Sequence, residues 1–416
     1  MTQRVWLAIA ALFLIAYTFI APPFQTPDEV GHFWRSYSVA IGTLNPEMTW
    51  RGPSAEVPGG VRKLVGALWV TPGTPEKVGM ERLRSAHEVQ LEREAPRAVT
   101  FPAFYTPVPH APQIVACFLG NSIGARPLYT FYFGRLCNAA VFLLLAFFAM
   151  RRLRVAGAVA LLPMALYLAA SFSSDAMTLG VAMVLTSLVL APSESESIGK
   201  LLIASLILAL CKPVYFLLPL VALVTIRKRL RFAVVLPIVL GVAISASVAS
   251  RHYFAMRGDA PVDANAQMQN VLDAPFRFAG IAANDLREHG LDYLEQMVGV
   301  LGWVDVPLPA PLVWLTLLAL ILTAAPSTLS PLTRVVALLI VIVTMGGIAL
   351  SQYLVWTPPG ATTVDGMQGR YWLPLLPMLL AAVGWKREQR WAPLAFGVMA
   401  MVINCAALVI LARRYY

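Results

Sequence analysis

The segment PPFQTPDEVGHFWR, residues 22–35, places two acids, a histidine and an arginine directly after a strongly apolar stretch. A carboxylate can act as a general base, and neighbouring cationic groups can orient it or bind an anion. At about 100° per residue, Asp28, His32 and Arg35 fall on one helix face and the apolar side chains on the other. This polar stripe predicts a functional face, and a merely solvated face is the alternative.

The same segment carries the signature of a helix start. Thr26 is expected as the N-cap, Pro27 as the first helical residue, and Glu29 as the third position of a capping box. Glu29 would then serve the cap, so Asp28 is the first candidate for a catalytic acid and Glu29 its competitor. We expect an interfacial helix over residues 27–41.

Two further ionisable residues interrupt apolar sequence, where a charge is costly and often functional. Lys212 stands between two apolar segments beside Pro213, which predicts a short hairpin with an outward tip. A lysine that snorkels to water is the alternative reading. Asp175, with Ser173 and Ser174 in SFSSDAMT, occupies a similar tip, and a solvated turn is its alternative.

Polar residues also occur near the ends of two other apolar segments. Arg135 and Asn138 lie three positions apart and therefore share a helix face. Gln368, Arg370 and Tyr371 belong to DGMQGRYWLP, and the planar arginine fork suits phosphate oxygens. The alternative for this last group is a set of interface anchors.

The composition indicates what must position these residues. Of the 416 residues 58% are hydrophobic and 13% charged, and the mean hydropathy is +0.68, which predicts a polytopic membrane protein. The net charge of +10 comes from short basic runs between apolar segments. Such runs are typical of cytoplasmic loops and do not indicate nucleic-acid binding.

A membrane helix needs about 20 apolar residues, and on this measure we expect about eleven spans in one all-α membrane domain, residues 1–416. The expected spans are 4–21, 127–150, 156–171, 176–192, 199–211, 214–226, 232–249, 311–325, 333–354, 371–385 and 391–412.

The basic runs place the N-terminus in the cytoplasm and three loops outside. Two outer loops are large, 22–110 and 250–310, and a third, 355–370, is short. The four cysteines show no metal or disulfide spacing, and no P-loop, GxGxxG or GxSxG motif occurs. What remains is a set of outward-facing carboxylates and cations, which suits proton removal beside a phosphate leaving group.

Six stretches, in this order, resemble a bacterial family of predicted membrane proteins called domain of unknown function twenty-one forty-two: PPFQTPDEVGHFWR, FGRLCN, SFSSDAMT, CKPVYF, GVLGWVD and MQGRYWLP. That family is similar to the GT-C glycosyltransferases, multi-helix enzymes that use polyprenyl-phosphate sugars on the outer side of the membrane. The resemblance implies an acid in the first outer loop as base or metal ligand, here Asp28 with Glu29 as competitor. No cofactor is certain, and a divalent metal (Mg or Mn) stays open.

The resulting expectation is a glycosyltransferase of the bacterial inner membrane, with its active site on the outer side. It would move a sugar from a polyprenyl-phosphate donor to a cell-envelope glycan or lipid, with inversion. A flippase of lipid-linked glycans, and a glycan polymerase or ligase that uses a lipid diphosphate, are the alternatives. Expected substrate-binding residues are His32, Arg35, Arg135, Asn138, Asp175, Lys212, Tyr215, Gln368, Arg370 and Tyr371.

Overall fold

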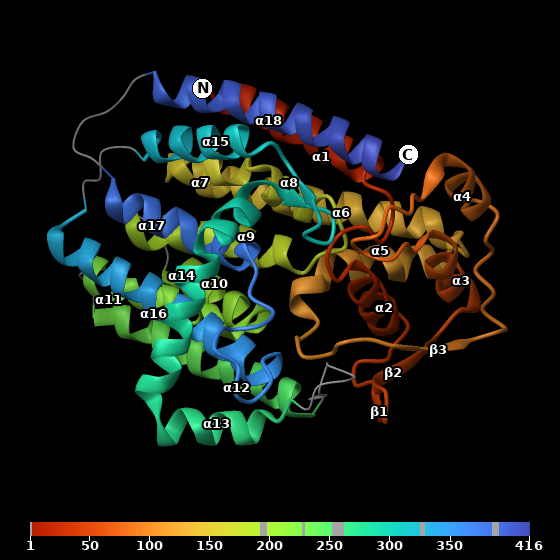
Figure 1. The fold of residues 1–416 in the computed structure, drawn as a ribbon, viewed down its shortest axis with the longest axis horizontal. Helices are drawn as coiled ribbons and strands as arrows, with labels where there is room; N and C mark the ends of the chain where they lie inside the picture. The colour runs from red at the N-terminus through yellow and green to blue at the C-terminus, as the bar shows by residue number, and fades with distance from the viewer. Residues whose placement is uncertain (1, 192–197, 227–228, 252–261, 325–328, 385–390) are drawn as a thin grey trace.

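The computed structural model of the chain describes residues 2–191, 198–226, 229–251, 262–324, 329–384 and 391–416. The described chain is mostly helical, as its composition predicts, with eighteen α-helices and two small sheets (Figure 1). The expected basic run at 386–390 and part of that at 227–231 lie outside the described residues.

The elements follow each other in chain order. The α-helices are α1 (Gln3–Ile20), α2 (Glu29–Ala40), α3 (Gly59–Leu68), α4 (Gly79–Ala86), α5 (Ala111–Ser122), α6 (Pro127–Met150), α7 (Arg154–Ala160), α8 (Pro163–Ala169), α9 (Asp175–Leu190), α10 (Ile198–Cys211), α11 (Ala222–Thr225), α12 (Val235–Arg251), α13 (Ala264–Asp273), α14 (Pro275–Gly299), α15 (Ala310–Leu322), α16 (Pro331–Val355), α17 (Leu376–Val383) and α18 (Ala392–Tyr415). The 3-10 helices are η1 (Val108–His110), η2 (Pro213–Tyr215), η3 (Leu218–Val221), η4 (Arg229–Val234) and η5 (Gly369–Leu375). The strands are β1 (Glu47–Thr49), β2 (Gly52–Val57), β3 (Arg97–Thr100), β4 (Val300–Leu301) and β5 (Val306–Pro307).

Five helical stretches of the described chain are long and apolar enough to cross a bilayer. They are α1, α6, α16, α18 and the stretch Phe232–Arg251 that contains α12. Other apolar stretches are shorter helices, so the expected total of about eleven spans stays a prediction. Two expected spans are interrupted. Residues 156–171 form α7 and α8, which meet at Pro163, and residues 214–226 form η2, η3 and α11.

A three-stranded antiparallel sheet, in the order β1-β2-β3, lies within the first large loop. The strictly all-α expectation is therefore wrong for these three strands and for the short antiparallel pair β4-β5, although α3 and α4 lie between β2 and β3. The strands of the first loop have three to six residues, too short for their alternation to stand out in a Pro-rich and Gly-rich loop. Figure 1 shows them with α2, α3, α4 and α5 at one end of the bundle.

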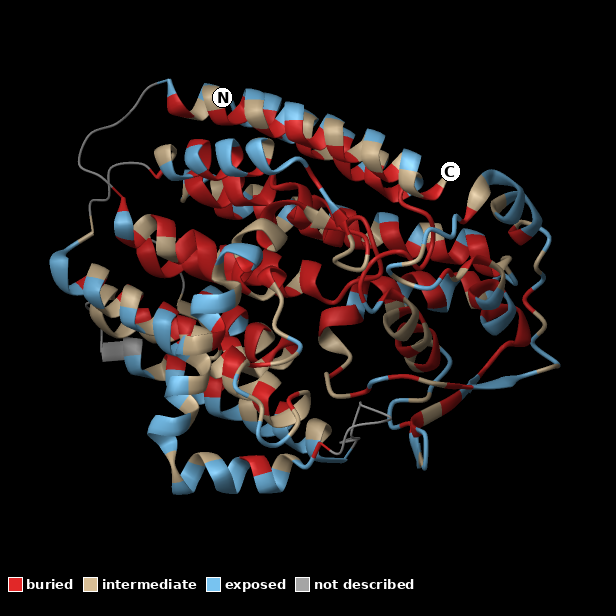
Figure 2. Ribbon diagram, in the orientation of Figure 1, coloured by how far each residue is buried: buried red, intermediate tan, exposed pale blue. Residues whose placement is uncertain are grey.

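The centre of the bundle is α9, which packs against α6 and α10. It is hydrophobic on all sides and buried along nearly its whole length (Figure 2). Along one edge of the molecule α1 and α18 lie side by side (Figure 1). Asp175 begins α9, so the central helix presents a carboxylate to the end of the bundle where α1 stops and α6 starts.

Candidate functional site

Asp28 occupies the turn before α2 in an unusual backbone conformation. Its φ is 63°, in the left-handed region, and it stands at the N-cap position without a side-chain cap. Asp tolerates this region better than most residues, although such a conformation costs about 1–3 kcal/mol. The predicted cap is wrong, because the Thr26 hydroxyl is buried without a hydrogen bond and α2 begins at Glu29.

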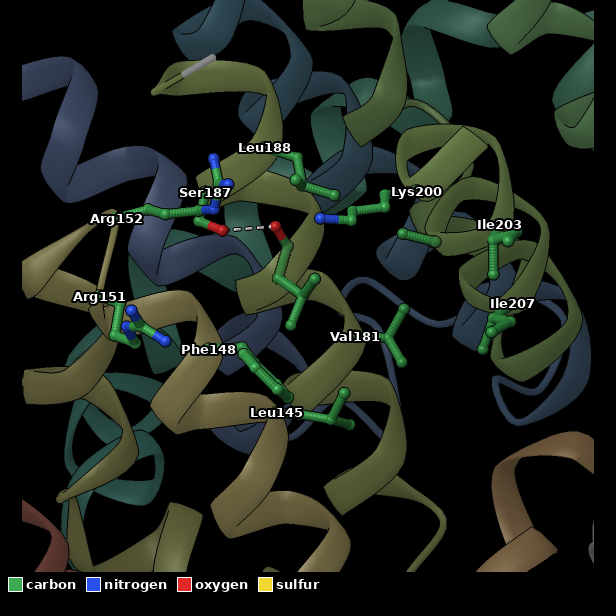
Figure 3. A pocket seen from close by; sticks show the side chains of 12 residues that line it. Leu145, Phe148, Arg151, Arg152, Val181, Ser187, Leu188, Lys200, Ile203 and Ile207 are labelled. Carbon is green, nitrogen blue, oxygen red and sulfur yellow. Dashed lines mark hydrogen bonds between the residues drawn. The ribbon is translucent and has the colours of Figure 1, made fainter. Parts of the chain in front are cut away.

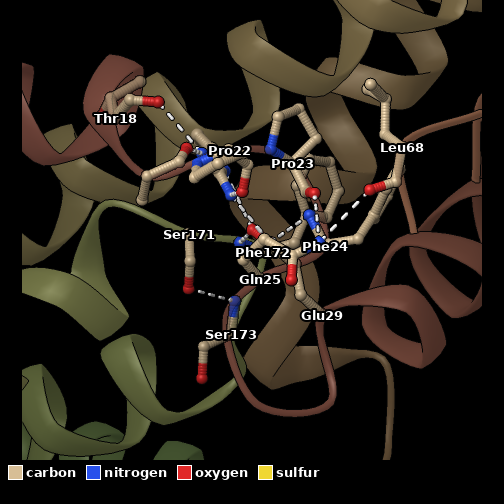
Figure 4. Close-up of polar contacts among 12 residues, drawn as sticks. Thr18, Pro22, Pro23, Phe24, Gln25, Glu29, Leu68, Ser171, Phe172 and Ser173 are labelled. Carbon is tan, nitrogen blue, oxygen red and sulfur yellow. Dashed lines mark hydrogen bonds and ion pairs between the residues drawn. The ribbon is translucent and has the colours of Figure 1, made fainter. Parts of the chain in front are cut away.

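Glu29 has a different structural role from the predicted one. Its carboxylate, labelled in Figure 4 beside Phe24 and Phe172, is fully buried. It accepts hydrogen bonds from Arg135 Nε at 2.9 Å and Nη2 at 2.7 Å. It also accepts the backbone N–H groups of Phe24 at 2.8 Å and Phe172 at 2.9 Å. A buried ion pair is tolerable when its remaining hydrogen bonds are satisfied, as they are here. Glu29 is therefore committed to holding segments together.

Arg135 and Asn138, on the start of α6, complete this buried clamp. Arg135 donates to the carbonyls of Thr18, Ala21 and Pro22 at 3.0, 2.6 and 3.0 Å, which ties down the end of α1. Asn138 donates to two carbonyls of the turn before α9, those of Ser171 at 2.8 Å and Ser173 at 3.2 Å. The structure thus places Arg135 and Asn138 beneath the site, with their donors used by the protein.

Four charged side chains form one continuous network above this clamp. Arg370 Nη2 donates to Asp28 Oδ2 at 2.6 Å. Arg370 Nη1 lies 3.4 Å from Asp175 Oδ2, and Lys212 Nζ donates to Asp175 Oδ1. The order Asp28, Arg370, Asp175, Lys212 therefore alternates in charge, and the four charges sum to zero. Four segments distant in the sequence meet here.

Aromatic residues surround the Lys212 end of the network. The ammonium lies 5.3 Å from the ring centroids of both Tyr105 and Tyr371, within cation–π range. The Tyr215 hydroxyl donates to the Tyr371 carbonyl at 2.8 Å. Lys212 is mostly buried and ion-paired, so it does not snorkel to water, and Tyr215 fixes the backbone beside Arg370.

The network combines exposed and unsatisfied polar groups. The Asp28 side chain is 53% exposed, whereas that of Arg370 is 3% exposed. Arg370 Nε is buried without a hydrogen bond, as are Ser174 Oγ and Gln368 Oε1 in the neighbouring segments, and Arg370 Nη1 has only its 3.4 Å contact with Asp175. Buried donors without acceptors are costly in a folded protein and commonly occur where a ligand binds.

A histidine pair lies beside Asp28. His32 Nδ1 and His110 Nε2 are 2.9 Å apart, and His110 Nδ1 is buried without a partner. Burial lowers the pKa of His32 to about 4, against an opposing effect of the Asp28 carboxylate. Burial also lowers the pKa of His110, with the adjacent His32 adding to this effect. Both rings are therefore neutral at pH 7, and one N–H donates to the other ring.

Asp28 itself is ionised at neutral pH. Its enclosure among neighbouring segments raises the pKa of the carboxyl, but the charge and hydrogen bond of Arg370 outweigh this and hold the pKa below its ordinary value. The polar stripe predicted that Arg35 shares the open helix face with Asp28, and this prediction is wrong. Arg35 is 2% exposed and donates to the Leu44 carbonyl at 3.0 Å, just beyond the end of α2.

Two residues near the network, His110 and Tyr105, were not among the predicted site residues. His110 lies between prolines in TPVPHAPQ, 78 positions after His32. The available signal was the position of both residues at the end of the first large loop, directly before an apolar segment. A single sequence could not show that the histidines face each other.

A divalent metal does not fit the carboxylates as they are placed. The carboxylate oxygens of Asp28 and Asp175 face Arg370 and Lys212. These cationic side chains therefore stand where a metal ion bound by the carboxylates would have to lie. Among the described residues no group of three or more His, Cys, Asp or Glu side chains is arranged to hold a metal ion.

These features define a polytopic helical membrane protein with a partly open charged network at one end of its bundle. The family model described as predicted membrane protein (DUF2142) matches residues 11–379, and the chain belongs to this family. No curated protein and no solved structure matches the chain.

Proposed function

We propose that this protein is a membrane glycosyltransferase that moves a sugar from a polyprenyl phosphate to a hydroxyl of a cell-envelope glycan or lipid. The observation that carries the proposal is the network in which the accessible Asp28 carboxylate contacts the buried Arg370 guanidinium at 2.6 Å. A base and an anion ligand are thereby adjacent at the end of membrane-spanning helices, where a lipid-linked substrate presents its headgroup. We assign the protein to a bacterial inner membrane with this end on the outer side, on the resemblance to GT-C enzymes.

Asp28 is the proposed base. It is ionised and half-exposed, so an acceptor hydroxyl can reach it, whereas Glu29 is fully buried and bonded to Arg135. The acceptor hydroxyl gives its proton to Asp28, and its oxygen forms a bond to the anomeric carbon. The bond from that carbon to the phosphate oxygen breaks, and its electron pair goes to the phosphate. Attack in line with the leaving group inverts the sugar.

Arg370 couples the two halves of this reaction. The departing phosphate gains one negative charge as the acceptor proton neutralises Asp28. Arg370 then loses its strongest anionic partner at the moment when a new anion forms next to it. Its Nε makes no hydrogen bond and its Nη1 has only the 3.4 Å contact with Asp175, so both can donate to that phosphate. Donors that act on developing charge favour the transition state over the ground state.

The remaining members of the network have supporting roles in this proposal. Asp175 holds Arg370 and Lys212 together, and Lys212 supplies a second cation for the phosphate. His32 and His110 are neutral, so they orient Asp28 or the sugar by hydrogen bonds without adding charge. The side-chain amide oxygen of Gln368 is buried without a partner, so it can accept a hydrogen bond from a sugar hydroxyl.

Reconstitution tests the proposed class of reaction. Proteoliposomes containing the purified protein would receive a labelled polyprenyl-phosphate sugar and a lipid extract as acceptor, and products would be identified by mass spectrometry. The proposal predicts a new glycosidic bond and free polyprenyl monophosphate. Movement of intact donor between leaflets without a new bond would indicate a flippase, and a requirement for lipid diphosphate would indicate a polymerase or ligase. Either outcome contradicts the proposal.

A further inference from the structure

A second site lies at the other end of the central helix. A cavity of about 760 Å³ has α9 as its floor and α6 and α10 as its walls (Figure 3). Asp175 begins α9, and the residues of α9 that line the cavity run from Val181 to Leu188, which is about 9 to 20 Å along the helix from the charged network. Its apolar lining includes Leu145, Phe148, Val181, Val184, Ile203 and Ile207.

The cavity opens toward the surface that faces the bilayer. Phe148 and Ile203 on its two walls are 50% and 61% exposed, whereas Val181 on its floor is 4% exposed. Ser187 is the polar residue of the floor, and its hydroxyl donates to the Val184 carbonyl at 2.7 Å. The lining therefore presents apolar surface to an occupant.

Three cations stand at one end of this apolar space. Arg151 and Arg152 follow the last turn of α6, and Lys200 belongs to the first turn of α10. Figure 3 shows the two arginines on one side of the cavity and Lys200 across from them. Arginine and lysine next to an apolar groove on membrane-spanning helices match the chemistry of an anionic lipid headgroup above its acyl chain.

We propose that this cavity binds one anionic membrane phospholipid. The phosphate lies among Arg151, Arg152 and Lys200, and an acyl chain lies along α9 between the two walls. A free phosphate would leave the apolar walls unused, and a zwitterionic lipid would gain less from the three cations. The site is independent of the proposed transfer reaction, because it is formed by different residues.

Lipid exchange on the purified full-length protein in nanodiscs tests this proposal. Native mass spectrometry would compare retention of phosphatidylglycerol and phosphatidylcholine after graded delipidation. We expect one phosphatidylglycerol to persist and inorganic phosphate not to displace it. Each of Arg151→Gln, Arg152→Gln and Lys200→Gln should weaken retention roughly fivefold. Val184→Trp, which places a bulky ring in the cavity and keeps the charges, should also weaken retention.

The matched control is Arg4→Gln. Arg4 is exposed at the start of α1. It lies at the same end of the bundle as the cavity cations, because Trp6 of α1 donates to the carbonyl of Gly157 in α7, which packs against Met150 at the end of α6. This change removes the same charge outside the cavity and should leave retention unchanged. Equal retention of both lipids by the wild type, an equal loss in Arg4→Gln, or displacement by inorganic phosphate would each overturn the proposal.

Discussion

At the residue scale, Asp28 and Glu29 are adjacent acids with opposite environments. Asp28 is half-exposed and paired with Arg370, whereas Glu29 is fully buried and paired with Arg135. A single step along the chain thus separates a carboxylate open to substrate from one that holds the fold. Asp28 also differs from Glu29 in its backbone, which lies in the left-handed region.

This difference predicts opposite effects of removing each charge. Glu29→Gln leaves the buried Arg135 charge uncompensated, so it should lower the free energy of unfolding by about 3–5 kcal/mol. Thermal unfolding of the purified protein measures this loss as a lower melting temperature. Glu94→Gln, at an exposed position, is the control and should be silent. An unchanged melting temperature in Glu29→Gln would contradict the assigned structural role.

The histidine pair predicts a dependence of stability on pH. His32 and His110 have lowered pKa values in the folded protein, so between pH 6.5 and about 4 the unfolded state binds more protons. The contribution of the two neutral histidines to the free energy of unfolding should therefore be fully present above pH 6.5 and should be lost as the pH falls toward 4. The double variant His32→Gln/His110→Gln should lose much of this dependence. Identical profiles for wild type and double variant, measured as melting temperature against pH, would refute the buried neutral pair.

Four members of the charged network were predictable from the sequence because charge in apolar surroundings is costly and therefore conspicuous. Their pairing was not predictable. Asp28 and Arg370 are 342 positions apart, and the sequence offers several acids as partners for each cation. The sequence also predicted Arg135 and Asn138 as substrate-binding residues, but it could not show that both are buried and donate to backbone carbonyls. Whether either also contacts substrate stays a prediction.

At the element scale, short breaks between helices build the site. The start of α9, the junction of α10 with η2 and the start of η5 each contribute one charged residue. The length of the apolar runs predicted the long apolar helices, because continuous apolar runs of about 20 residues are typical of membrane-spanning helices. The sequence-based prediction failed where prolines divide apolar stretches, as in residues 156–171, and where strands are short.

The turn before α9 provides a prediction at this scale. Asn138→Ala would leave the Ser171 carbonyl without its amide donor and the Ser173 carbonyl with the Gln113 amide alone, at a cost of about 1–3 kcal/mol in the free energy of unfolding. The turn should loosen and Asp175 should be displaced, so the transfer rate should fall as well. Thermal unfolding and the transfer assay measure both effects. Asn265→Ala, at an exposed position, should change neither, and wild-type behaviour of Asn138→Ala would contradict the clamp.

At the scale of the whole molecule, the two ends of the bundle differ. The charged network lies at the end that carries α2–α5 and the sheet β1-β2-β3, which Figure 1 shows together. The other end carries Arg4, Arg151, Arg152 and Lys200. This distribution of basic residues is typical of cytoplasmic ends. We therefore expect the proposed reaction and the proposed lipid site on opposite sides of the membrane.

Cysteine labelling tests this orientation. Trp50, in the loop between β1 and β2, is 82% exposed, and Arg4 is exposed at the opposite end. A membrane-impermeant maleimide added to intact cells should label Trp50→Cys above the level of the parent chain. Arg4→Cys should be labelled only after permeabilisation. The reverse pattern would invert the assigned orientation.

The central claim is that Asp28 removes the acceptor proton. The most direct measurement is the initial rate of sugar transfer by Asp28→Asn in proteoliposomes, with the melting temperature of the variant equal to that of the wild type. The control is Asp273→Asn, which changes an exposed acid on α13. We predict a fall of about 10²–10⁴-fold for Asp28→Asn and no change for Asp273→Asn. A folded Asp28→Asn protein that transfers sugar at the wild-type rate would contradict the account.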